Sequence, residues 1–391
     1  MQIYLDHSAT TPTRPEAIDL MYQVLGHQWG NPSSTHEWGQ RAATVVERAR
    51  MQVAALINAL PESIAFTSGG TESNNLAIMG VARQYRRSQH VIISSVEHSA
   101  IAEPVRLLEA WGWQVTRLPV DKMGRVNPLE LQAALQPNTV LVSIIYGQSE
   151  VGTLQPIQSL GTIAQAHGAV FHTDAVQVAG RLPIDVQQLP IDLLSLSSHK
   201  LYGPQGAGAI YVRPGVELVP LLGGGGQEFQ VRSGTQAVPA IAGFGMAAEW
   251  AAQEMALEVP RLVMLRDRLF AGLADVSDLM PTGVHGAWLH ENPLSRLPHH
   301  ASFTIPFTDG KTLVRQMNLA GIAVSSGSAC HSGKTIPSPV LQAMGYDDRL
   351  AKGGIRLTLG RETTEADVDW TAIVLKQILE RLMPELVGTR S

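Results

Sequence analysis

The chain has 391 residues and a formal net charge of −5 at pH 7. A chain of this length is longer than one ordinary hydrophobic core supports, which predicts two domains. The acidic balance, without any Lys- or Arg-rich run, argues against a nucleic-acid partner. No apolar stretch is long enough to cross a bilayer, and the start MQIYLDHSATTP lacks a secretory pattern. We therefore expect a cytoplasmic protein with no membrane and no nucleic-acid partner.

Helical and strand patterns alternate along the first two thirds of the chain. Helices are predicted over residues 36–58, 71–85 and 100–112. The predicted strands are short apolar runs, namely 63–68, 90–95, 115–120, 139–146, 169–174, 192–197 and 208–212. Short apolar strands with intervening helices predict an α/β fold with a mainly parallel sheet sandwiched by helices. Ligands of such sheets bind at the carboxyl ends of the strands.

The pattern changes from about Val238. Two helical stretches, 238–255 and 260–275, precede a smaller α+β unit that ends in a helix from Glu365. We expect a large domain over residues 1–255 and a small C-terminal domain over residues 256–391. The first ~15 residues are a segment that can pack with the small domain.

Cys330 is the only cysteine in the sequence, which excludes an internal disulfide framework and a cysteine-based zinc cluster. A lone cysteine is usually a small buried hydrophobic residue. Here the surrounding sequence, AVSSGSACHSGKTIPSP, is small, polar and glycine-bearing on both sides. That composition predicts an exposed, mobile loop rather than a core strand.

Residues suited to chemistry follow the ends of four predicted strands. Gly70 and Thr71 open a helix after strand 63–68, where free backbone N–H groups and the helix dipole suit a phosphate. Taken alone this signal is weak, since such helix starts are common caps. The other strand ends carry His98, Asp174 with Gln177, and the run Ser197, Ser198, His199 and Lys200.

Lys200 has two interpretations. A lysine in a turn between two strands is more often simply exposed to solvent, but it can also be an amine that forms a Schiff base with a carbonyl cofactor. Asp174 would then keep a pyridine nitrogen protonated, and Gln177 can reach a ring hydroxyl. Asp174 as a helix cap and His98 as a core histidine are the ordinary explanations. Their joint occurrence with Lys200 at successive strand ends predicts pyridoxal phosphate bound to this lysine.

The order of the motifs resembles that of cysteine desulfurases of the NifS/IscS type. These are pyridoxal phosphate enzymes of the class V aminotransferase family, with the aspartate aminotransferase fold (fold type I). The resemblance covers nearly the whole chain, and SSHK and SSGSAC are its most specific parts. The matching segments are YLDHSATTP, GNPSSTHEWGQRA, FTSGGTESNN, EHSA, HTDAVQ, SSHKLYGPQGAGAIYV, GGGGQE, RSGT and SSGSAC.

The resemblance implies a role for each candidate residue. Lys200 would hold the cofactor, Asp174 would pair with its ring nitrogen, and Gln177 would bond its hydroxyl. His98 would stack on the ring and shuttle protons, and Arg356 would grip the substrate carboxylate with its two-pronged donor. The phosphate would be held by Gly70, Thr71, Ser197, Ser198 and His199 together with Thr235 of the neighbouring subunit, so a homodimer is implied.

The implied reaction removes sulfur from L-cysteine. Cys330, as thiolate, takes the sulfur as a persulfide for a sulfur acceptor or an iron–sulfur scaffold protein, and L-alanine is released. At Ser149, family members commonly carry an asparagine near the cofactor hydroxyl and the substrate. The sequence ends at PELVGTRS, without the longer tail that IscS-type enzymes use to dock a scaffold, which leaves the acceptor open.

Three alternatives compete with this assignment. Within the same fold, a β-eliminating C–S lyase or a selenocysteine lyase would need no persulfide. Cys330 favours the desulfurase over these lyases, whereas Ser149 leaves room for a lyase. A nicotinamide dehydrogenase is rejected because the glycines of 243–248 and near Gly206 neither follow a strand nor open a helix in the required context. A non-enzymatic scaffold protein would not need Lys200 and Cys330 together with an aspartate at a neighbouring strand end.

Overall fold

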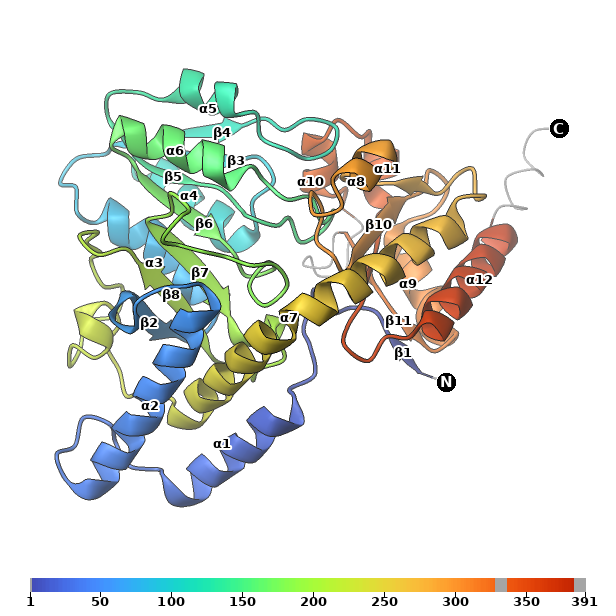
Figure 1. Cartoon of the computed structure of the whole chain (residues 1–391). Coiled ribbons are helices and arrows are strands. Elements are labelled where there is room, and N and C mark those ends of the chain that lie inside the picture. Colours follow the sequence, from blue (N-terminus) through green and yellow to red (C-terminus); the bar gives the residue numbers. More distant parts are fainter. Residues whose placement is uncertain (1, 328–335, 383–391) are drawn as a thin grey trace.

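Figure 1 shows a computed structural model of the chain, which describes residues 2–327 and 336–382. A larger part, built on one broad sheet, is joined by the long helix α7 (Val238–Leu273) to a smaller part with its own sheet. Among the described residues, no helix is long and apolar enough to span a bilayer.

The large sheet has seven strands within the described residues. All of its neighbouring pairs are parallel except those of β8, which runs antiparallel to both β2 and β7. The prediction of a mainly parallel sheet is therefore confirmed. In spatial order the strands are β2 (Ile64–Thr67), β8 (Gly208–Val212), β7 (Leu193–Ser197), β6 (Val170–Asp174), β5 (Thr139–Ser143), β3 (His90–Ser94) and β4 (Gln114–Leu118).

Helices cover both faces of this sheet, as the fold-class prediction requires. On one face Ile92 of β3 packs in a cluster with α2 (Glu37–Leu56), α6 (Ile157–His167) and the start of α7. On the other face its neighbours Val91 and Ile93 pack with α3 (Gly70–Ala82) and α4 (Ser99–Ala110). Successive residues of a strand point to opposite faces, so a strand buried on both sides reads as a continuous apolar run. The larger part also contains one further short α-helix and three 3₁₀ turns: α5 (Pro128–Ala134), η1 (Pro61–Ser63), η2 (Ser198–Lys200) and η3 (Glu228–Gln230).

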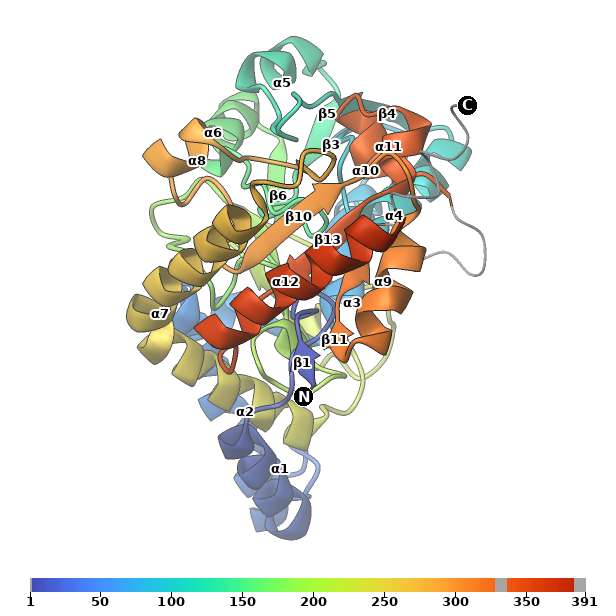
Figure 2. The ribbon, with the colours of Figure 1, turned by 90° about the vertical axis from the view of Figure 1, so that its right-hand side faces the viewer.

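The smaller part contains a four-stranded antiparallel sheet within the described residues, in the order β12 (Ser325–Ser326), β13 (Ile355–Thr358), β10 (His300–Thr304) and β9 (Met280–Pro281). In Figure 2, α12 (Glu365–Leu382) crosses in front of β10 and β13. Near the N-terminus, β1 (Ile3–Tyr4) pairs in parallel with β11 (Ile322–Ala323), so the beginning of the chain joins this part. Short helices complete it: α8 (Ala287–Glu291), α9 (Gly310–Leu319), α10 (Pro339–Ala343) and α11 (Asp348–Lys352).

Helix α7 differs from its prediction. The two stretches expected over 238–255 and 260–275 form one continuous helix that passes through Pro260. A proline inside a helix removes one backbone hydrogen bond, and packing outweighs that loss here. Phe244 of α7 is buried in the core of the large part, whereas Leu269 is buried in the core of the small part. The boundary predicted at residue 255 falls inside this helix, and the division of the chain there stays a proposal.

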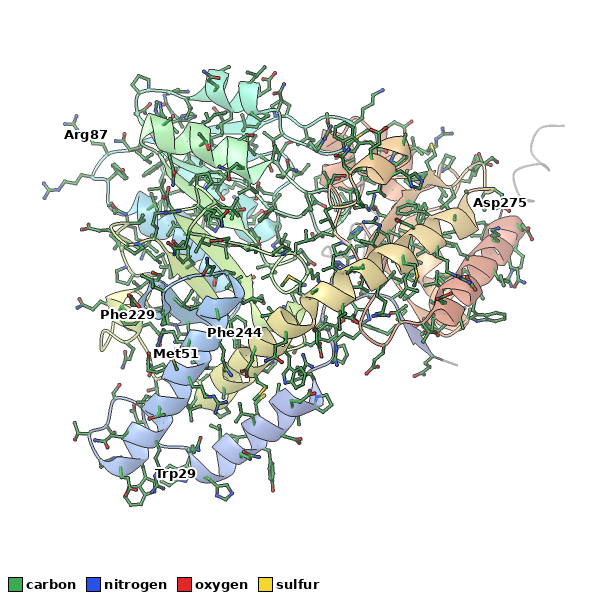
Figure 3. All side chains as sticks on the ribbon, viewed as in Figure 1. Trp29, Met51, Arg87, Phe229, Phe244 and Asp275 are labelled. Atoms are coloured by element: carbon green, nitrogen blue, oxygen red, sulfur yellow. The ribbon has the colours of Figure 1, made fainter. Side chains whose placement is uncertain are left out.

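Helix α1 (Pro15–His27) packs against α7 at one end of the molecule (Figure 1). Figure 3 contrasts an interior and a peripheral aromatic residue: Phe244 lies among the helices, while Phe229 of η3 lies at the edge of the molecule. Their side chains are respectively buried and exposed.

Candidate active site

The candidate site lies at the carboxyl ends of β6 and β7. Asp174 is the last residue of β6, and Lys200 ends the η2 turn that follows β7 directly. Because β6 and β7 are parallel neighbours, their carboxyl ends meet at the same edge of the sheet. The structure thus brings Asp174 and Lys200 to the edge where the sequence predicts them.

Lys200 points back toward the N-terminal segment of the chain. Its Nζ donates hydrogen bonds to the carbonyl oxygens of Ser8 at 2.6 Å and Ala9 at 2.7 Å. Burial, helped by the positive charges of Arg356 and Arg181, lowers the pKa of Lys200 to about 8. At pH 7 about a tenth of such amines are unprotonated, against well under a thousandth for an ordinary exposed lysine. Lys200 is therefore a usable nucleophile and base near neutral pH.

The Asp174 carboxylate is buried and partly satisfied. One oxygen accepts a hydrogen bond from Nδ2 of Asn74 at 2.7 Å, and the other accepts one from the backbone N–H of Val176 at 3.0 Å. Sequence reasoning missed Asn74. It lies four residues after Gly70, one turn into α3, and residues at that spacing share a helix face. The segment GGTESNN therefore contained the signal for it.

Two buried serine hydroxyls follow each other at the end of β7, and the side chain of Ser197 lies beside the start of α3. The Oγ atoms of Ser197 and Ser198 are buried, and neither has a hydrogen-bond partner in the part of the chain that the structure describes. A Cβ placed on Gly70, the first residue of α3, would lie 3.4 Å from the Cβ of Ser197. Buried polar atoms without partners are uncommon. The unpartnered hydroxyl of Ser197, at a helix N-terminus, is suited to an anion such as a phosphate. The Oγ of Ser198 lies against Gly203 instead.

His199 and Gln177 contact the same N-terminal segment as Lys200. Nδ1 of His199 lies 3.1 Å from the Thr10 hydroxyl, and burial lowers the pKa of His199 to about 4, so its ring is neutral at pH 7. Nε2 of Gln177 donates to the carbonyl of Ser8 at 2.9 Å. Its Oε1 is buried and has no partner among the described residues, so it remains free to accept a hydrogen bond from a ligand.

Arg356 projects from β13 of the smaller part. Its Nη1 donates to the main-chain carbonyl of Ser149 at 3.0 Å, and its Nη2 donates to Oδ1 of Asp6 at 2.8 Å. The positive charge of Arg356 lowers the pKa of Lys200, which places the two cations near each other. Ser149 thus meets Arg356 through its backbone, whereas the prediction for Ser149 concerned its side chain.

Three predicted residues are not part of this buried cluster. His98 is exposed and caps α4, accepting a hydrogen bond from the N–H of Ala100 at its Nδ1. Thr71, in the first turn of α3, and Thr235, in the segment before α7, are both exposed. Cys330 lies outside the described residues.

Glu97, the neighbour of His98, was also missed by sequence reasoning. Its Oε1 accepts hydrogen bonds from the Ser94 hydroxyl at 2.5 Å and from the N–H of Ile145 at 2.9 Å. Burial raises the pKa of Glu97 to about 8, and the nearby charge of Asp174 adds to the effect. A neutral Glu97 therefore ties the end of β3 to the segment that follows β5. The segment EHSA contains this glutamate, but only its histidine carried a prediction.

The N-terminal segment, residues 5–11, is the largest part of the site that sequence reasoning missed. It supplies the Asp6 carboxylate to Arg356 and two carbonyls to Lys200. Thr11 adds a hydrogen bond from its N–H to the His199 carbonyl at 2.9 Å. The motif YLDHSATTP covers this segment, but backbone carbonyls have no signature in a sequence.

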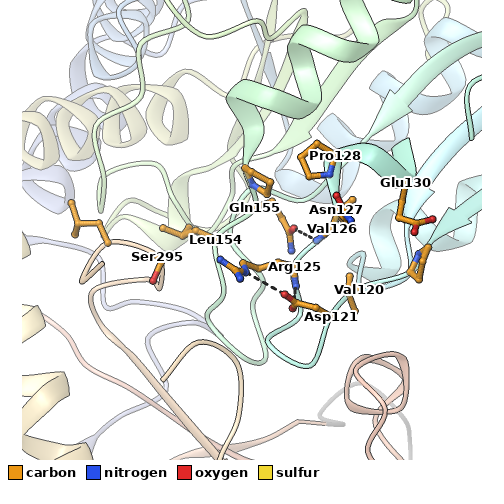
Figure 4. Close-up of a pocket in the computed structure, with 13 residues that line it drawn as sticks. Val120, Asp121, Arg125, Val126, Asn127, Pro128, Glu130, Leu154, Gln155 and Ser295 are labelled. Carbon is orange, nitrogen blue, oxygen red and sulfur yellow. Dashed lines mark hydrogen bonds and ion pairs between the residues drawn. The ribbon is translucent and has the colours of Figure 1, made fainter. Parts of the chain in front are cut away.

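A separate cavity of about 670 Å³ is shown in Figure 4. The N–H of Val126 and Oε1 of Gln155 form a hydrogen bond in it, and Arg125 and Asp121 form an ion pair there. None of the residues around Lys200 lines it. Within the described ranges, no group of three or more His, Cys, Asp or Glu side chains is arranged to hold a metal ion.

A doubly covered α/β sheet with a half-buried lysine and a buried aspartate at adjacent strand ends is the arrangement that class V aminotransferases are expected to share. The model of that family, described as aminotransferase class-V, matches residues 3–370, so the chain belongs to this family. The resemblance stated from the motifs is confirmed.

Individual relatives agree. The chain is 44% identical over 383 residues to the "Cysteine desulfurase IscS" of Dictyoglomus turgidum, covering 97% of this chain and 95% of that protein. It resembles the solved structure of a "NIFS-LIKE PROTEIN" with a TM-score of 0.89 at 35% identity, covering 97% of this chain and all of the other. A structure titled "SspA in complex with cysteine" matches with a TM-score of 0.77 at 33% identity, covering 92% of this chain and 99% of that one.

Proposed function

We propose that the protein is a cysteine desulfurase, which takes sulfur from L-cysteine, releases L-alanine and carries the sulfur as a persulfide on Cys330. The observation that carries the proposal is the half-buried Lys200 amine, whose pKa is lowered to about 8 and which lies at the strand end next to that of Asp174. Relatives named cysteine desulfurase support it, since one is 44% identical over 97% of this chain.

The side chains around Lys200 fit pyridoxal phosphate. The unpartnered hydroxyl of Ser197 and the start of α3 at Gly70 suit its phosphate, with Thr71, Ser198 and His199 next to them in the chain. Asp174 suits the ring nitrogen, and the free Oε1 of Gln177 suits the ring hydroxyl. When bound, this cofactor supplies an electron sink that stabilises negative charge at the substrate Cα.

The protein side chains position the substrate and move its protons. Arg356 would bind the cysteine carboxylate, Lys200 would hold the cofactor, and the Lys200 amine would accept the Cα proton of the substrate. The carbonyls of Ser8 and Ala9 keep that amine oriented. His98 would face the cofactor ring and shuttle protons.

Sulfur transfer is assigned to Cys330. As a thiolate it attacks the substrate sulfur, a new S–S bond forms, and the C–S bond breaks with its electron pair passing to the substrate Cβ. Cβ then gains one proton, which balances the proton lost by the Cys330 thiol, and the return of the Cα proton completes alanine. No external oxidant is required, because Cβ is reduced by the same two electrons that the sulfur loses.

We further propose a cytoplasmic homodimer in which Thr235 completes the phosphate site of the neighbouring subunit. The exposure of Thr235 supports this assignment, since a residue that serves another chain must lie at the surface. A sulfur-acceptor protein, or an iron–sulfur scaffold, would receive the persulfide sulfur.

The test is to mix the purified protein with L-cysteine and to measure alanine and protein-bound sulfane sulfur. The variant Cys330→Ser should keep the cofactor absorption and its change on cysteine addition, while alanine falls to background and no persulfide forms. A serine hydroxyl is too weakly acidic to replace the thiolate at neutral pH. If Cys330→Ser turned over cysteine at the wild-type rate and gave pyruvate, the enzyme would instead be a β-eliminating lyase.

A further inference from the structure

Two nitrogens of the Arg356 guanidinium have hydrogen-bond partners in the described residues, and the third has none. A guanidinium carries five N–H donors, and two of them bind Asp6 and the carbonyl of Ser149. Nε is buried and has no partner among the residues that the structure describes. A buried donor without a partner is costly, so this free edge is suited to an acceptor that arrives with a ligand.

Asp6 is fixed to the strand that carries Arg356. Asp6 forms a parallel bridge with Thr358, two residues beyond Arg356 on β13. On either side of it, the N–H of Thr358 donates to the carbonyl of Leu5 at 2.7 Å, and the N–H of His7 donates to the carbonyl of Thr358 at 3.5 Å. The main chain, rather than a flexible side chain alone, therefore sets where the Asp6 carboxylate meets Arg356.

The second contact of Arg356 is fixed from the opposite direction. The Ser149 carbonyl is also 3.1 Å from Nε2 of His300, whose Nδ1 lies 3.3 Å from Nη2 of the buried Arg296. Because a guanidinium only donates, Nδ1 of His300 is the acceptor and Nε2 carries the proton toward Ser149. The carbonyl that receives Arg356 is therefore itself anchored.

We infer that Asp6 is a positioning residue for substrate binding: it orients the Arg356 guanidinium so that its free edge receives the carboxylate of the amino-acid substrate. The inference rests on the proposed function and adds to it a residue that the proposed mechanism leaves without a role. Charge-assisted hydrogen bonds are the stronger ones, and a preoriented arginine loses less conformational freedom when a carboxylate binds. If Asp6 instead competed with the substrate for Arg356, removing the charge of Asp6 would make the substrate carboxylate bind more tightly.

The experiment compares two ligands in the cofactor-loaded enzyme. L-alanine has the carboxylate that Arg356 would bind, and ethylamine is the same molecule without it. Asp6→Asn keeps the size and one acceptor but removes the charge. We expect it to raise the dissociation constant of L-alanine about tenfold and to leave that of ethylamine within a factor of about two, with both constants read from the absorption of the bound cofactor. For L-cysteine, KM should rise more than kcat falls.

A double-mutant cycle provides the specific control. In an Arg356→Gln background, Asp6→Asn should have no further effect on L-alanine, since Asp6 acts through Arg356. Glu103→Gln, which removes the charge of an exposed carboxylate paired with Arg106, should leave both ligands unaffected. Unchanged ethylamine binding also shows that the Asp6 variant has folded.

The inference is overturned if Asp6→Asn weakens both ligands equally, if it tightens L-alanine, or if its effect persists in the Arg356→Gln background. A wild-type protein that takes up no cofactor, or binds neither ligand, would overturn the proposed function itself, and this is seen before any Asp6 variant is measured. The two failures are thus distinguishable.

Discussion

Glu228 and Arg50 form an ion pair that is almost completely buried, with 1% and 3% of their side chains exposed. The Glu228 carboxylate accepts hydrogen bonds from both terminal nitrogens of Arg50, at 2.6 and 3.0 Å, and from the N–H of Phe66 at 2.7 Å. It lies in the η3 turn, where Glu228, Phe229 and Gln230 all have positive φ, of 47°, 57° and 67°. Such a backbone persists only where its surroundings hold it in place.

We predict that Glu228→Gln strongly destabilises the protein. The substitution leaves the buried Arg50 guanidinium with only one counter-charge, Glu47, whose side chain is 58% exposed. Breaking a buried pair costs about 3–5 kcal/mol. The three strained residues store about 1–3 kcal/mol each, so the turn can relax and let water reach Arg50. We therefore expect the free energy of unfolding to fall by an amount near the lower limit of that range, about 3 kcal/mol.

Urea unfolding measures this loss as a shift of the midpoint and of the apparent free energy of unfolding. The matched control is Glu103→Gln, because Glu103 and Arg106 form an ion pair whose side chains are 61% and 63% exposed. An exposed pair contributes about 0–1 kcal/mol. Replacing both buried partners, as Arg50→Met with Glu228→Leu, should recover most of the loss. If Glu228→Gln unfolds at the same urea concentration as Glu103→Gln, the pair does not hold the turn.

Three further predictions concern the cofactor site, and a fourth concerns the dimer. Burial lowers the pKa of Lys200 to about 8, so the unprotonated fraction of its amine rises steeply between pH 6 and pH 8. Cofactor uptake by the cofactor-free protein should therefore increase about tenfold from pH 6 to pH 7 and level off above about pH 8. A flat pH profile would contradict this assignment. Lys200→Ala should lose the yellow absorption on dialysis, and a colourless wild type would refute the cofactor proposal. Asp174→Asn should still bind the cofactor but lose most of its activity, since an amide cannot hold the ring nitrogen protonated; near-normal turnover would mean that Asp174 has another role. Thr235→Ala should weaken cofactor retention in a protein that sedimentation shows to be a dimer, and a fully active monomer would exclude the shared site.

The amino-acid sequence by itself determined the features that arise from local patterns. The apolar runs of β3, β6 and β7 and the amphipathic helices around them predict a doubly covered sheet, because strands buried on both faces contain few polar residues. Parallel neighbours end at one edge of a sheet, so the positions of Asp174 and Lys200 at the ends of two such strands suffice to predict that both lie at that edge. The same reasoning found the Gly70 turn and the serines before Lys200.

Only the tertiary structure decided the contacts between distant segments. Asp6 meets Arg356 across 350 residues, and Glu228 meets Arg50 across 178. The carbonyls that hold the Lys200 amine belong to Ser8 and Ala9, and every residue has a carbonyl, so side-chain identity could not reveal them. Helix α7 continues through Pro260 because its two ends pack in different cores. Each of these features depends on which surfaces the folded chain places together. The periodicity of apolar residues shows that one face of a segment is buried, but it does not show which other segment covers that face.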